Sequence, residues 1–551
     1  MSNTLLTTLD RTRLRASYES GFWRDETIYA LAAAWARREP GASALRDAHR
    51  RVTYGEMVAA ADLLAAQLRE AGLRRGQRVA VWLPSRLETA VALLACSRDG
   101  LVCCPSLHRD HTVGDVVELL TRMRAAALIT QPGYGADAPR HDLFAAIADS
   151  PHLKRVFRLE PAGSGPLWPG PADGGVAAEA AVDTDPDSVV YLAFTSGTTG
   201  QPKGVMHSDN TLLANGRAVA ADWMLGADDV ITTLSPLSHN LGFGSLVLAL
   251  LTGAELVIND MARGASLLDR LVETGTSYLV GVPTHAIDLL DELRRRGVQQ
   301  LGRVRGFRIS GAAVPQAVIA ELIAHGVTPQ SGYGMTEASS HHYTLPDDPL
   351  ARMVETSGRV CPGYEVQVFS REDPELALPA GEVGQIGGRG ASLMLGYFDA
   401  QEATEDSFNR QGWFMTGDLG WVDEQGYIRI TGRKKDVIIR GGHNIFPAKI
   451  EGLAMQHPAV LRAAALPVPD ARLGEKVCLA VMLRPGQSVE PEALLLHLDA
   501  SGLSKYDQPE FFIEVAEMPL TASGKILKRA VATRLEAGEL IPVPVRLPSA
   551  A

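Results

Sequence analysis

Lysine is scarce in this sequence. Only nine of its 53 basic residues are Lys, and the rest are Arg. The basic residues form no run or stripe, and 64 acidic residues give a net charge of −11. A protein that binds nucleic acid through its phosphates needs clustered Lys and Arg. The composition therefore excludes nucleic acid as the main partner.

Cysteine and long apolar runs are also sparse. The five cysteines are odd in number and show no C-x-x-C spacing, which argues against a disulfide framework or a zinc site. Residues 1–10 lack the basic and apolar regions of a secretory signal. The most apolar stretch, residues 241–258, contains three Gly and Glu255, so we expect buried core elements rather than a membrane span. These features predict a cytoplasmic protein.

The chain of 551 residues is too long for one hydrophobic core. Up to about residue 350, short apolar runs alternate with helical stretches, which indicates parallel α/β construction. Residues 357–431 have short strands separated by Gly and Pro, which is typical of an antiparallel barrel. We predict an α/β fold: a large N-terminal domain (1–434) of doubly wound α/β sheets plus a distorted β-barrel, and a small mobile α+β C-terminal domain (435–551).

The apolar periodicity places individual elements. Helices are expected at 57–71, 86–98, from 244 onward, at 447–456 and near 490–500. Strands are expected at 78–83, 189–194, 230–234, 277–280, 305–310, 460–467 and 477–483.

The segment Tyr191–Gly204 combines an apolar strand with a loop rich in hydroxyls and glycine. From Thr195 onward, ten residues hold four hydroxyl side chains, three Gly and Lys203. Glycine lets backbone N–H groups turn toward an anion, hydroxyls donate to phosphate oxygens, and Lys adds a positive charge. The segment is not a Walker P-loop, because Pro202 stands where that motif needs Gly. The pattern predicts a phosphate-binding loop.

The scarcity of Lys draws attention to a second position. Lys525 follows Gly524 in the segment Pro519–Lys528. A flexible ammonium group is able to follow a moving charge, whereas a guanidinium prefers a fixed bidentate partner. We therefore note Lys525, together with Lys203, as a lysine kept in a sequence that otherwise uses Arg.

Five short motifs together resemble the adenylate-forming superfamily, which includes acyl-CoA synthetases and aryl-acid-activating enzymes. They are residues 195–204, Gly332-Tyr333-Gly334-Met335-Thr336-Glu337, Trp413-Phe414-Met415-Thr416-Gly417-Asp418, Gly432-Arg433-Lys434-Lys435-Asp436 and Gly524-Lys525. They occur in the family's order, and the resemblance extends from about residue 20 to residue 530.

The resemblance implies a binding site for ATP and Mg²⁺. In it, Tyr333 would lie against adenine, Asp418 and Arg433 would bind the ribose, and the carboxylate of Glu337 would bind Mg²⁺. The implied nucleotide-binding residues are Thr195, Ser196, Gly197, Thr198, Thr199, Lys203, Gly311, Ala312, Ala313, Ser331, Gly332, Tyr333, Gly334, Thr336, Asp418 and Arg433.

The family chemistry has two steps. A carboxylate attacks the α-phosphate of ATP to give an acyl-AMP and pyrophosphate, and a thiol then attacks the acyl-AMP. Attack brings two anions together, so a protonated Lys525 would lower the barrier, with Thr195, Lys203 and Glu337 as further catalytic residues. The resemblance also implies a hinge at Lys435 and a CoA channel at Gly441 and Gly442.

Family position suggests an acyl pocket formed by His239, Asn240, Phe243, Gly311 and Met335. His239-Asn240 is similar to the polar pair that meets ring hydroxyls in dihydroxybenzoate-adenylating enzymes, whereas residues 195–204 and 441–447 look more like acid–CoA ligases for cyclohexanecarboxylate and related ring acids. A third interpretation is that His239 and Asn240 are a satisfied polar pair beside a strand end.

We therefore expect an ATP-dependent carboxylate–CoA ligase (an acid–thiol ligase) that acts on a cyclic or medium-size acid, with CoA as co-substrate. One alternative is an aryl-acid–AMP ligase that loads a carrier-protein phosphopantetheine. A second alternative, a nucleotide-binding sensor, is disfavoured by intact Lys203, Glu337, Asp418 and Lys525. The oligomeric state stays open, and a homodimer would be compatible with the family.

Overall fold

The computed structural model describes residues 5–170, 182–183, 185–195, 202–262, 264–311, 314–441, 443–520 and 526–547. Its largest element is a nine-stranded sheet, parallel in the middle and antiparallel at both edges. In spatial order the strands are β15 (Arg359–Val360), β14 (Ser339–Tyr343), β13 (Thr328–Met335), β12 (Gly306–Ser310), β11 (Tyr278–Gly281), β9 (Val230–Thr233), β10 (Glu255–Ile258), β1 (Ser43–Arg46) and β2 (Arg51–Thr53).

A second sheet has six strands, and only its last pair is antiparallel. Its order is β6 (Arg155–Arg158), β5 (Ala125–Thr130), β3 (Arg78–Trp82), β4 (Val102–Cys104), β7 (Val189–Thr195) and β8 (Lys203–Ser208). The parallel strands read as continuous apolar runs because helices cover both faces of the sheet.

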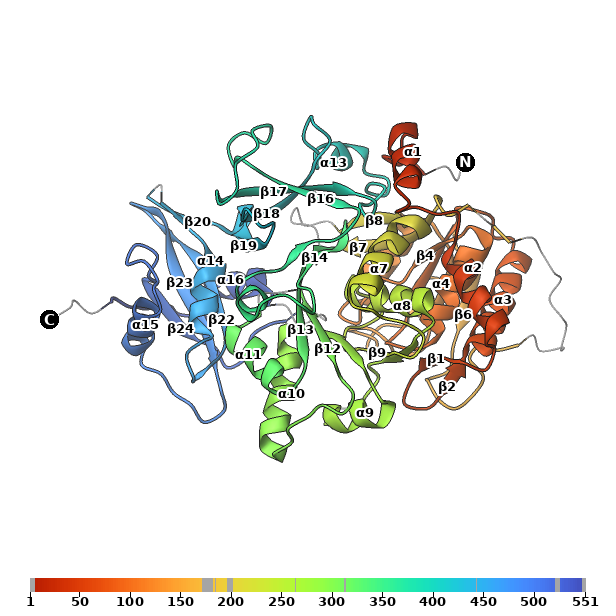
Figure 1. Cartoon of the computed structure of the whole chain (residues 1–551), viewed down its shortest axis with the longest axis horizontal. Coiled ribbons are helices and arrows are strands. Elements are labelled where there is room, and N and C mark those ends of the chain that lie inside the picture. The colour runs from red at the N-terminus through yellow and green to blue at the C-terminus, as the bar shows by residue number, and fades with distance from the viewer. Residues whose placement is uncertain are drawn as a thin grey trace.

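One layer of helices packs between these two sheets, and its apolar side chains form a single core cluster with strands of both (Figure 1). The helices are α2 (Ile28–Arg38), α3 (Tyr54–Glu70), α4 (Glu88–Asp99), α7 (Asp209–Asp222) and α8 (Asn240–Thr252). Local sequence sets their ends: Thr53 and Glu56 form a capping box at the start of α3, and Gly253, with φ of 79°, ends α8.

The outer faces of the sheets carry their own helices. The nine-stranded sheet packs Leu279, Phe307 and Ile309 against α9 (Leu267–Thr274), α10 (Pro283–Arg296) and α11 (Gln316–Ala324). The six-stranded sheet packs against α5 (Val113–Arg122) and α6 (Leu143–Ala146). Since side chains alternate along a strand, residues 308 and 310 of β12 face the inner helix layer.

The region predicted as a distorted barrel forms a four-stranded antiparallel sheet of β16 (Tyr364–Phe369), β17 (Gly384–Gly390), β18 (Phe414–Val422) and β19 (Ile428–Arg433). A bridge between Arg359 and Tyr427 connects it to the edge of the nine-stranded sheet. Three short helices stand apart from these layers: α1 (Arg11–Glu19), α12 (Leu350–Glu355) and α13 (Gln401–Glu405).

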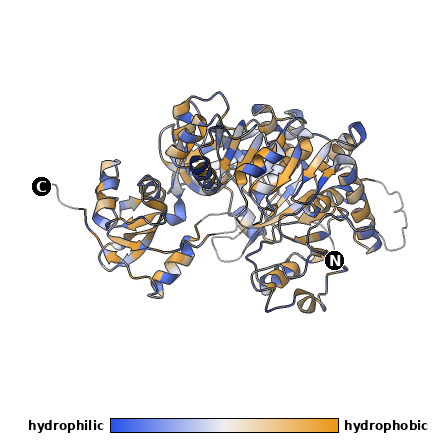
Figure 2. Ribbon diagram, turned by 90° about the horizontal axis from the view of Figure 1, so that it is seen from below, coloured by the Kyte–Doolittle hydropathy of each residue, from blue (hydrophilic) through white to orange (hydrophobic). Residues whose placement is uncertain are grey.

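The end of the chain forms a separate sheet with its own core, reached through the short 3₁₀ turn η1 (Lys434–Asp436). Figure 2 shows this α+β body beside the rest of the molecule, with strands mostly in the hydrophobic colour. Its strands are β20 (Ile438–Arg440), β21 (His443–Ile445), β22 (Val460–Asp470), β23 (Gly474–Leu483), β24 (Phe511–Glu514) and β25 (Val543–Pro544). Its helices are α14 (Pro447–Ala454), α15 (Pro491–Ala500) and α16 (Lys528–Glu536).

The expected fold class, α/β sheets followed by a small α+β body, is confirmed. Most predicted elements recur within a few residues of their expected bounds. The start of α8 differs, because the helix begins at Asn240 rather than Gly244. A Cβ at Gly242 would lie 2.3 Å from the carbonyl oxygen of Pro236, so this close approach, and not helix propensity, places the glycine in the first turn. No helix in the described part of the chain is both long and apolar enough to cross a membrane.

Candidate active site

The residues predicted to bind ATP come from strands of three different sheets, several of them at or next to a strand end. β7 ends at Thr195 and β8 starts at Lys203, while β12 and β13 end at Ser310 and Met335. The antiparallel strands β18 and β19 supply the predicted ribose-binding pair. In open α/β sheets, ligands bind in the crevice outside the carboxyl ends of the strands.

Tyr333, Asp418 and Arg433 form a connected polar group. The hydroxyl of Tyr333 donates to Asp418 Oδ2 at 2.8 Å, and Arg433 Nε lies 3.0 Å from Asp418 Oδ1. Burial and the neighbouring carboxylate raise the pKa of Tyr333, so its phenol stays protonated and donates. Asp418 is almost fully buried, whereas about half of the Arg433 side chain is exposed. The half-exposed guanidinium is thus oriented by its carboxylate and remains accessible to a ligand.

Glu337 lies beside Tyr397 and Lys203. The Tyr397 hydroxyl donates to Glu337 Oε1 at 2.9 Å, and Lys203 Nζ lies 4.8 Å from the centre of the Tyr397 ring. Burial raises the pKa of Glu337 above its usual range, and the Tyr397 hydrogen bond opposes this in part. The arrangement puts a carboxylate and an ammonium group beside one aromatic ring.

These residues fit a magnesium ion that is carried by a nucleotide. Glu337 makes no ion pair with any described cationic side chain, and its raised pKa means that a bound cation would favour its ionised form. Within the described ranges no three His, Cys, Asp or Glu residues gather into a metal cage. Mg²⁺ is commonly bound by one or two carboxylates, substrate phosphates and water, so a single Glu is the expected protein ligand.

The ends of the predicted phosphate-binding loop are well placed. Thr195 pairs with Lys203 across the β7–β8 hairpin, and its hydroxyl donates to the Lys203 carbonyl oxygen at 3.4 Å. Lys203 is thereby held at the base of the loop. Four predicted phosphate ligands lie outside the described residues, namely Ser196, Gly197, Thr198 and Thr199.

Backbone segments approach each other closely around Gly332 and Gly334, which are among the predicted nucleotide-binding residues. Ser310 donates to the Gly332 carbonyl oxygen at 3.2 Å, and Gly311, with φ of 96°, turns the chain away from β12. A Cβ at Gly334 would lie 2.1 Å from the Ser339 carbonyl oxygen, which explains the glycine there. The Thr336 carbonyl oxygen accepts from His207 Nε2 at 2.7 Å.

Ser331 has a different environment from the other predicted nucleotide ligands. It is buried, its backbone N–H donates to Thr344, and its hydroxyl donates to the Met353 carbonyl oxygen at 3.3 Å. These bonds hold β13 in place. Two further predicted residues, Ala312 and Ala313, lie outside the described residues.

A cavity of about 150 Å³ opens next to Gly311 and Gly334, between β12, β13 and the helices α7 and α8. One side is apolar, with Leu212 and Val219 from α7 and Val247 and Leu248 from α8. Four of the five predicted acyl-pocket residues line it: His239, Asn240, Gly311 and Met335. The cavity also includes Thr336 and Gly334, so it adjoins the residues predicted to bind the nucleotide.

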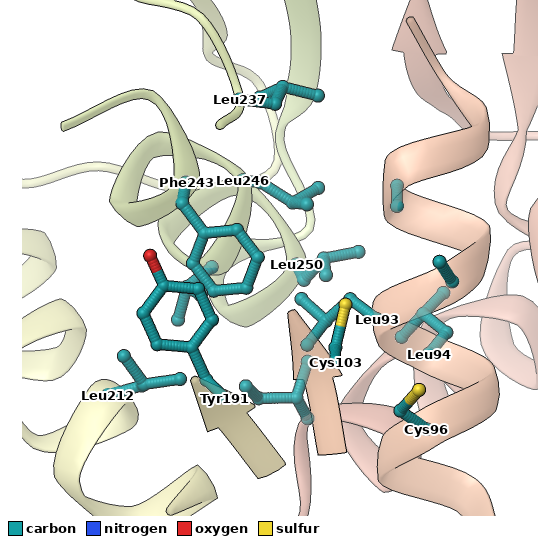
Figure 3. Packing of buried hydrophobic residues seen from close by; sticks show 14 of the residues in the cluster. Leu93, Leu94, Cys96, Cys103, Tyr191, Leu212, Leu237, Phe243, Leu246 and Leu250 are labelled. Atoms are coloured by element: carbon teal, nitrogen blue, oxygen red, sulfur yellow. The ribbon is translucent and has the colours of Figure 1, made fainter. Parts of the chain in front are cut away.

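Phe243 does not belong to this cavity, which corrects the expected pocket. Its ring is fully buried and stacks on Tyr191, with centroids 4.1 Å apart, among leucines of the core (Figure 3). On α8, Gly244 is the residue that lines the cavity instead. Successive residues of a helix point about 100° apart, so family position alone does not separate these two neighbours.

His239 belongs to a group of imidazoles beside the cavity. Its ring stacks on His108, with centroids 4.1 Å apart, and the His108 ring nitrogen Nδ1 lies 3.0 Å from the Ser238 hydroxyl. Burial lowers the pKa of His108 to about 4, so this ring is neutral at pH 7. Asn240 donates weakly to the Met335 carbonyl oxygen at 3.5 Å.

The predicted residues of the C-terminal body lie on its exposed surface or outside the described residues. Lys435 lies in η1, and its side chain is largely exposed. Partial burial lowers its pKa; the charges of Arg433 and Arg529 lower the pKa further, and those of Asp436 and Asp418 oppose this. Gly441, with φ of 58°, ends β20 in a turn. Gly442 and Lys525 lie outside the described residues.

Several polar side chains of the site are absent from the predicted set, among them Tyr397, His108 and Arg308. Tyr397 and His108 come from loops that no short motif marks. Arg308 does have a sequence signal, because it interrupts an otherwise apolar strand that leads into Ser310-Gly311. A charged residue within a buried strand needs either a partner or a ligand.

Comparison with known proteins gives the class. Residues 32–398 match the family described as AMP-binding enzyme, and residues 449–525 match the AMP-binding enzyme C-terminal domain. The chain thus belongs to the AMP-binding enzymes, within the adenylate-forming superfamily, as its motifs predict. More particularly, it is an ATP-dependent acid–thiol ligase of the acyl- and aryl-CoA ligase branch.

Three relatives illustrate the similarity. A medium-chain fatty-acid–CoA ligase of Escherichia coli is 33% identical over 96% of this chain and 94% of its own length. A sulfoacetate–CoA ligase of Cupriavidus necator is 34% identical over 91% of this chain and 96% of its own length. The crystal structure of ATP-bound MatB from Rhodopseudomonas palustris superposes with a TM-score of 0.81 at 29% identity and covers 93% of this chain and all of that one (100%).

Proposed function

We propose that the enzyme converts a compact carboxylic acid, cyclic or of medium size, into its CoA thioester through an acyl-AMP. One observation carries this proposal: the cavity shares Gly311, Gly334 and Thr336 with the predicted nucleotide site. An acid in the cavity would therefore direct its carboxylate toward the α-phosphate of ATP. Holding two reactants at one boundary removes much of the entropic barrier to their reaction.

The large N-terminal part would hold ATP. Tyr333 would lie against adenine, while Asp418, fixed by its bonds to Tyr333 and Arg433, would accept from the ribose hydroxyls. Lys203 and the hydroxyls of the adjoining loop would bind the outer phosphates. Mg²⁺, bound through Glu337, would neutralise charge on the phosphates.

The C-terminal part would supply Lys525 for adenylation. Its ammonium group would neutralise the carboxylate and the α-phosphate as they approach. Rotation at Lys435 would then withdraw Lys525 and bring the turn at Gly441 and Gly442 to the site, where the CoA thiol attacks. The exposure of Lys435 in a three-residue turn between two sheets supports this role.

The cavity supports a small acid. A cavity of about 150 Å³ with one apolar side is able to hold a single benzene-size ring. Cyclohexanecarboxylate, benzoate and unbranched acids of similar volume are the substrates we propose. The acids named for the two relatives above, medium-chain fatty acids and sulfoacetate, fall on both sides of this size.

The test is acid-dependent exchange of pyrophosphate into ATP, run with linear, alicyclic and aromatic acids of four to ten carbons. CoA is added in a second assay, and the thioester is identified by mass spectrometry with no carrier protein present. We expect both activities with the same acids. Exchange without thioester formation would favour the carrier-protein alternative, and the absence of exchange with every acid would contradict the proposal.

A further inference from the structure

Arg308 is a buried cation that has no partner among the residues the structure describes. It lies in the middle of β12, is 8% exposed, and its Nε is fully shielded from solvent. No hydrogen bond or ion pair connects it to any residue in the described ranges. Buried guanidinium groups are almost always paired, because an unpaired charge has lost its water without a replacement.

The side chains around Arg308 are already satisfied by one another or carry no charge. Val280 and Gln330 flank it in register on β11 and β13, and Gln330 accepts a hydrogen bond from Tyr278. The nearby carboxylate of Asp222 accepts from the Tyr343 hydroxyl at 2.8 Å and forms no ion pair with Arg308. The described part of the chain therefore provides no anion for this guanidinium.

Arg308 lines the cavity that adjoins the nucleotide site. It is two residues before Ser310 on the same face of β12, which places its Cα about 6.6 Å further from the strand end that carries Gly311. The hydroxyl of Ser235 lines the same cavity and is likewise buried with no hydrogen-bond partner among the described residues. The Arg308 guanidinium and the Ser235 hydroxyl are thus two hydrogen-bond donors without a described partner that line the space proposed for the acyl chain.

We propose that Arg308 binds a second anionic group of the acid substrate, a carboxylate or sulfonate at the end remote from the reacting carboxylate. This inference rests on the proposed ligase function and adds to the monoacids named above a preferred class of substrate, short acids with two negative charges. A guanidinium binds such groups through two parallel charge-assisted hydrogen bonds. Its apolar neighbours on α7 and α8 would pack against the carbons between the two acidic ends.

The experiment compares acids that differ only at the remote end. Propanoate, butanoate and hexanoate are measured against malonate, succinate and adipate, with sulfoacetate as the sulfonate and succinamate as a neutral amide. The readout is kcat/KM for CoA thioester formation in the full-length enzyme. We expect the diacids to exceed the matched monoacids by about tenfold or more, with the amide close to the monoacids.

Arg308→Met retains the length of the apolar side chain and removes the charge. We expect the diacid-to-monoacid ratio to fall by about 10- to 100-fold, the KM for ATP to stay unchanged, and part of the ratio to be retained in Arg308→Lys. Arg303→Met is the matched control, since Arg303 is exposed and outside the cavity. The melting temperature of Arg308→Met should equal or exceed that of the wild type, because a buried unpaired charge has been removed.

The outcomes separate this inference from the ligase function. A wild-type preference for monoacids, equal use of succinate and succinamate, or a ratio unchanged by Arg308→Met would overturn the role of Arg308 and leave the ligase function standing. Inactivity with every acid would overturn both. A preference for sulfoacetate over malonate would identify the group bound by Arg308 as a sulfonate, and the reverse preference would identify it as a carboxylate.

Discussion

Replacing Gly244 by Ala adds one methyl group to the wall of the cavity proposed to hold the acid. Gly244 is on α8, lines the cavity, and a Cβ built on it meets no atom within 4 Å. Its φ is not in the left-handed region, so Ala fits the helix without strain. The new methyl group would therefore take space from the substrate and not from the protein.

The magnitude follows from two separate effects. In a helix interior, Ala is more favourable than Gly by about 1 kcal/mol, so the variant should be at least as stable as the wild type. In a cavity of about 150 Å³, the methyl group would displace about one methylene of a substrate that fills it. A misfit of one methylene in an apolar pocket costs about 1–3 kcal/mol, which is roughly a 10- to 200-fold loss of kcat/KM.

The assay measures kcat/KM for CoA thioester formation over a series of acids of increasing size. We expect Gly244→Ala to leave the smallest acids unchanged and to lower the values for the largest acids that the wild type accepts. Gly452→Ala serves as the matched control, because Gly452 is also helical and a Cβ there would meet no atom within 4 Å, but this glycine is in the C-terminal body.

Two results would refute the reasoning. An equal fall in kcat/KM for all acids would mean that the substitution affects nucleotide binding or the stability of the fold, and thermal melting would distinguish these two causes. Unchanged selectivity, with Gly244→Leu behaving in the same way, would mean that the acid does not occupy this cavity.

Three further changes test other parts of the site. Lys525→Ala should abolish pyrophosphate exchange yet still transfer a supplied acyl-AMP to CoA; an equal loss of both steps would contradict the two-state C-terminal body. Asp418→Asn removes the charge that holds Arg433 and Tyr333, and should raise the KM for ATP by about 10- to 100-fold with little change in the KM for the acid. Asp209 is buried, accepts from the Ile28 N–H at 2.8 Å, and burial raises its pKa from 3.8 to about 7. The native state thus keeps a proton that the unfolded chain releases, and stability falls as pH rises from about 4 to 7. An Asn side chain does not titrate, so the stability of Asp209→Asn does not fall in this way. The difference in free energy of unfolding between the variant and the wild type, measured in urea, should therefore shift in favour of the variant by about 4 kcal/mol between about pH 4 and pH 7. If the difference in stability between the wild type and Asp209→Asn did not change with pH, Asp209 would be ionised in the folded protein.

Much of the fold was predictable because its elements carry strong local patterns. The apolar run of β3 and the helical spacing of α3, which ends before Gly72, place these elements within a few residues. The start of α8 was not predictable, because Gly242 is there for a backbone contact with Pro236 that only the folded chain makes. The boundary at residues 434 and 435 remains a prediction.

The residues predicted to bind the nucleotide have a clearer sequence signal than those of the cavity proposed for the acid. Tyr333, Glu337, Asp418 and Arg433 belong to short contiguous motifs, so their predicted roles are visible in the sequence. The partner of Glu337, Tyr397, was missed because it comes from a loop 60 residues away with no motif of its own.

The chemistry of the site is encoded locally, because contiguous motifs supply the hydroxyls, the ammonium group, the carboxylate and the aromatic ring that adenylation needs. The shape and charge of the space for the acid depend instead on tertiary packing. That space is made by α7, α8, β12 and β13, which are far apart in the chain and meet only in the folded protein. Whether Phe243 or its neighbour Gly244 faces the acid, and whether Arg308 finds an anion within the protein, depends on those contacts and on no local pattern.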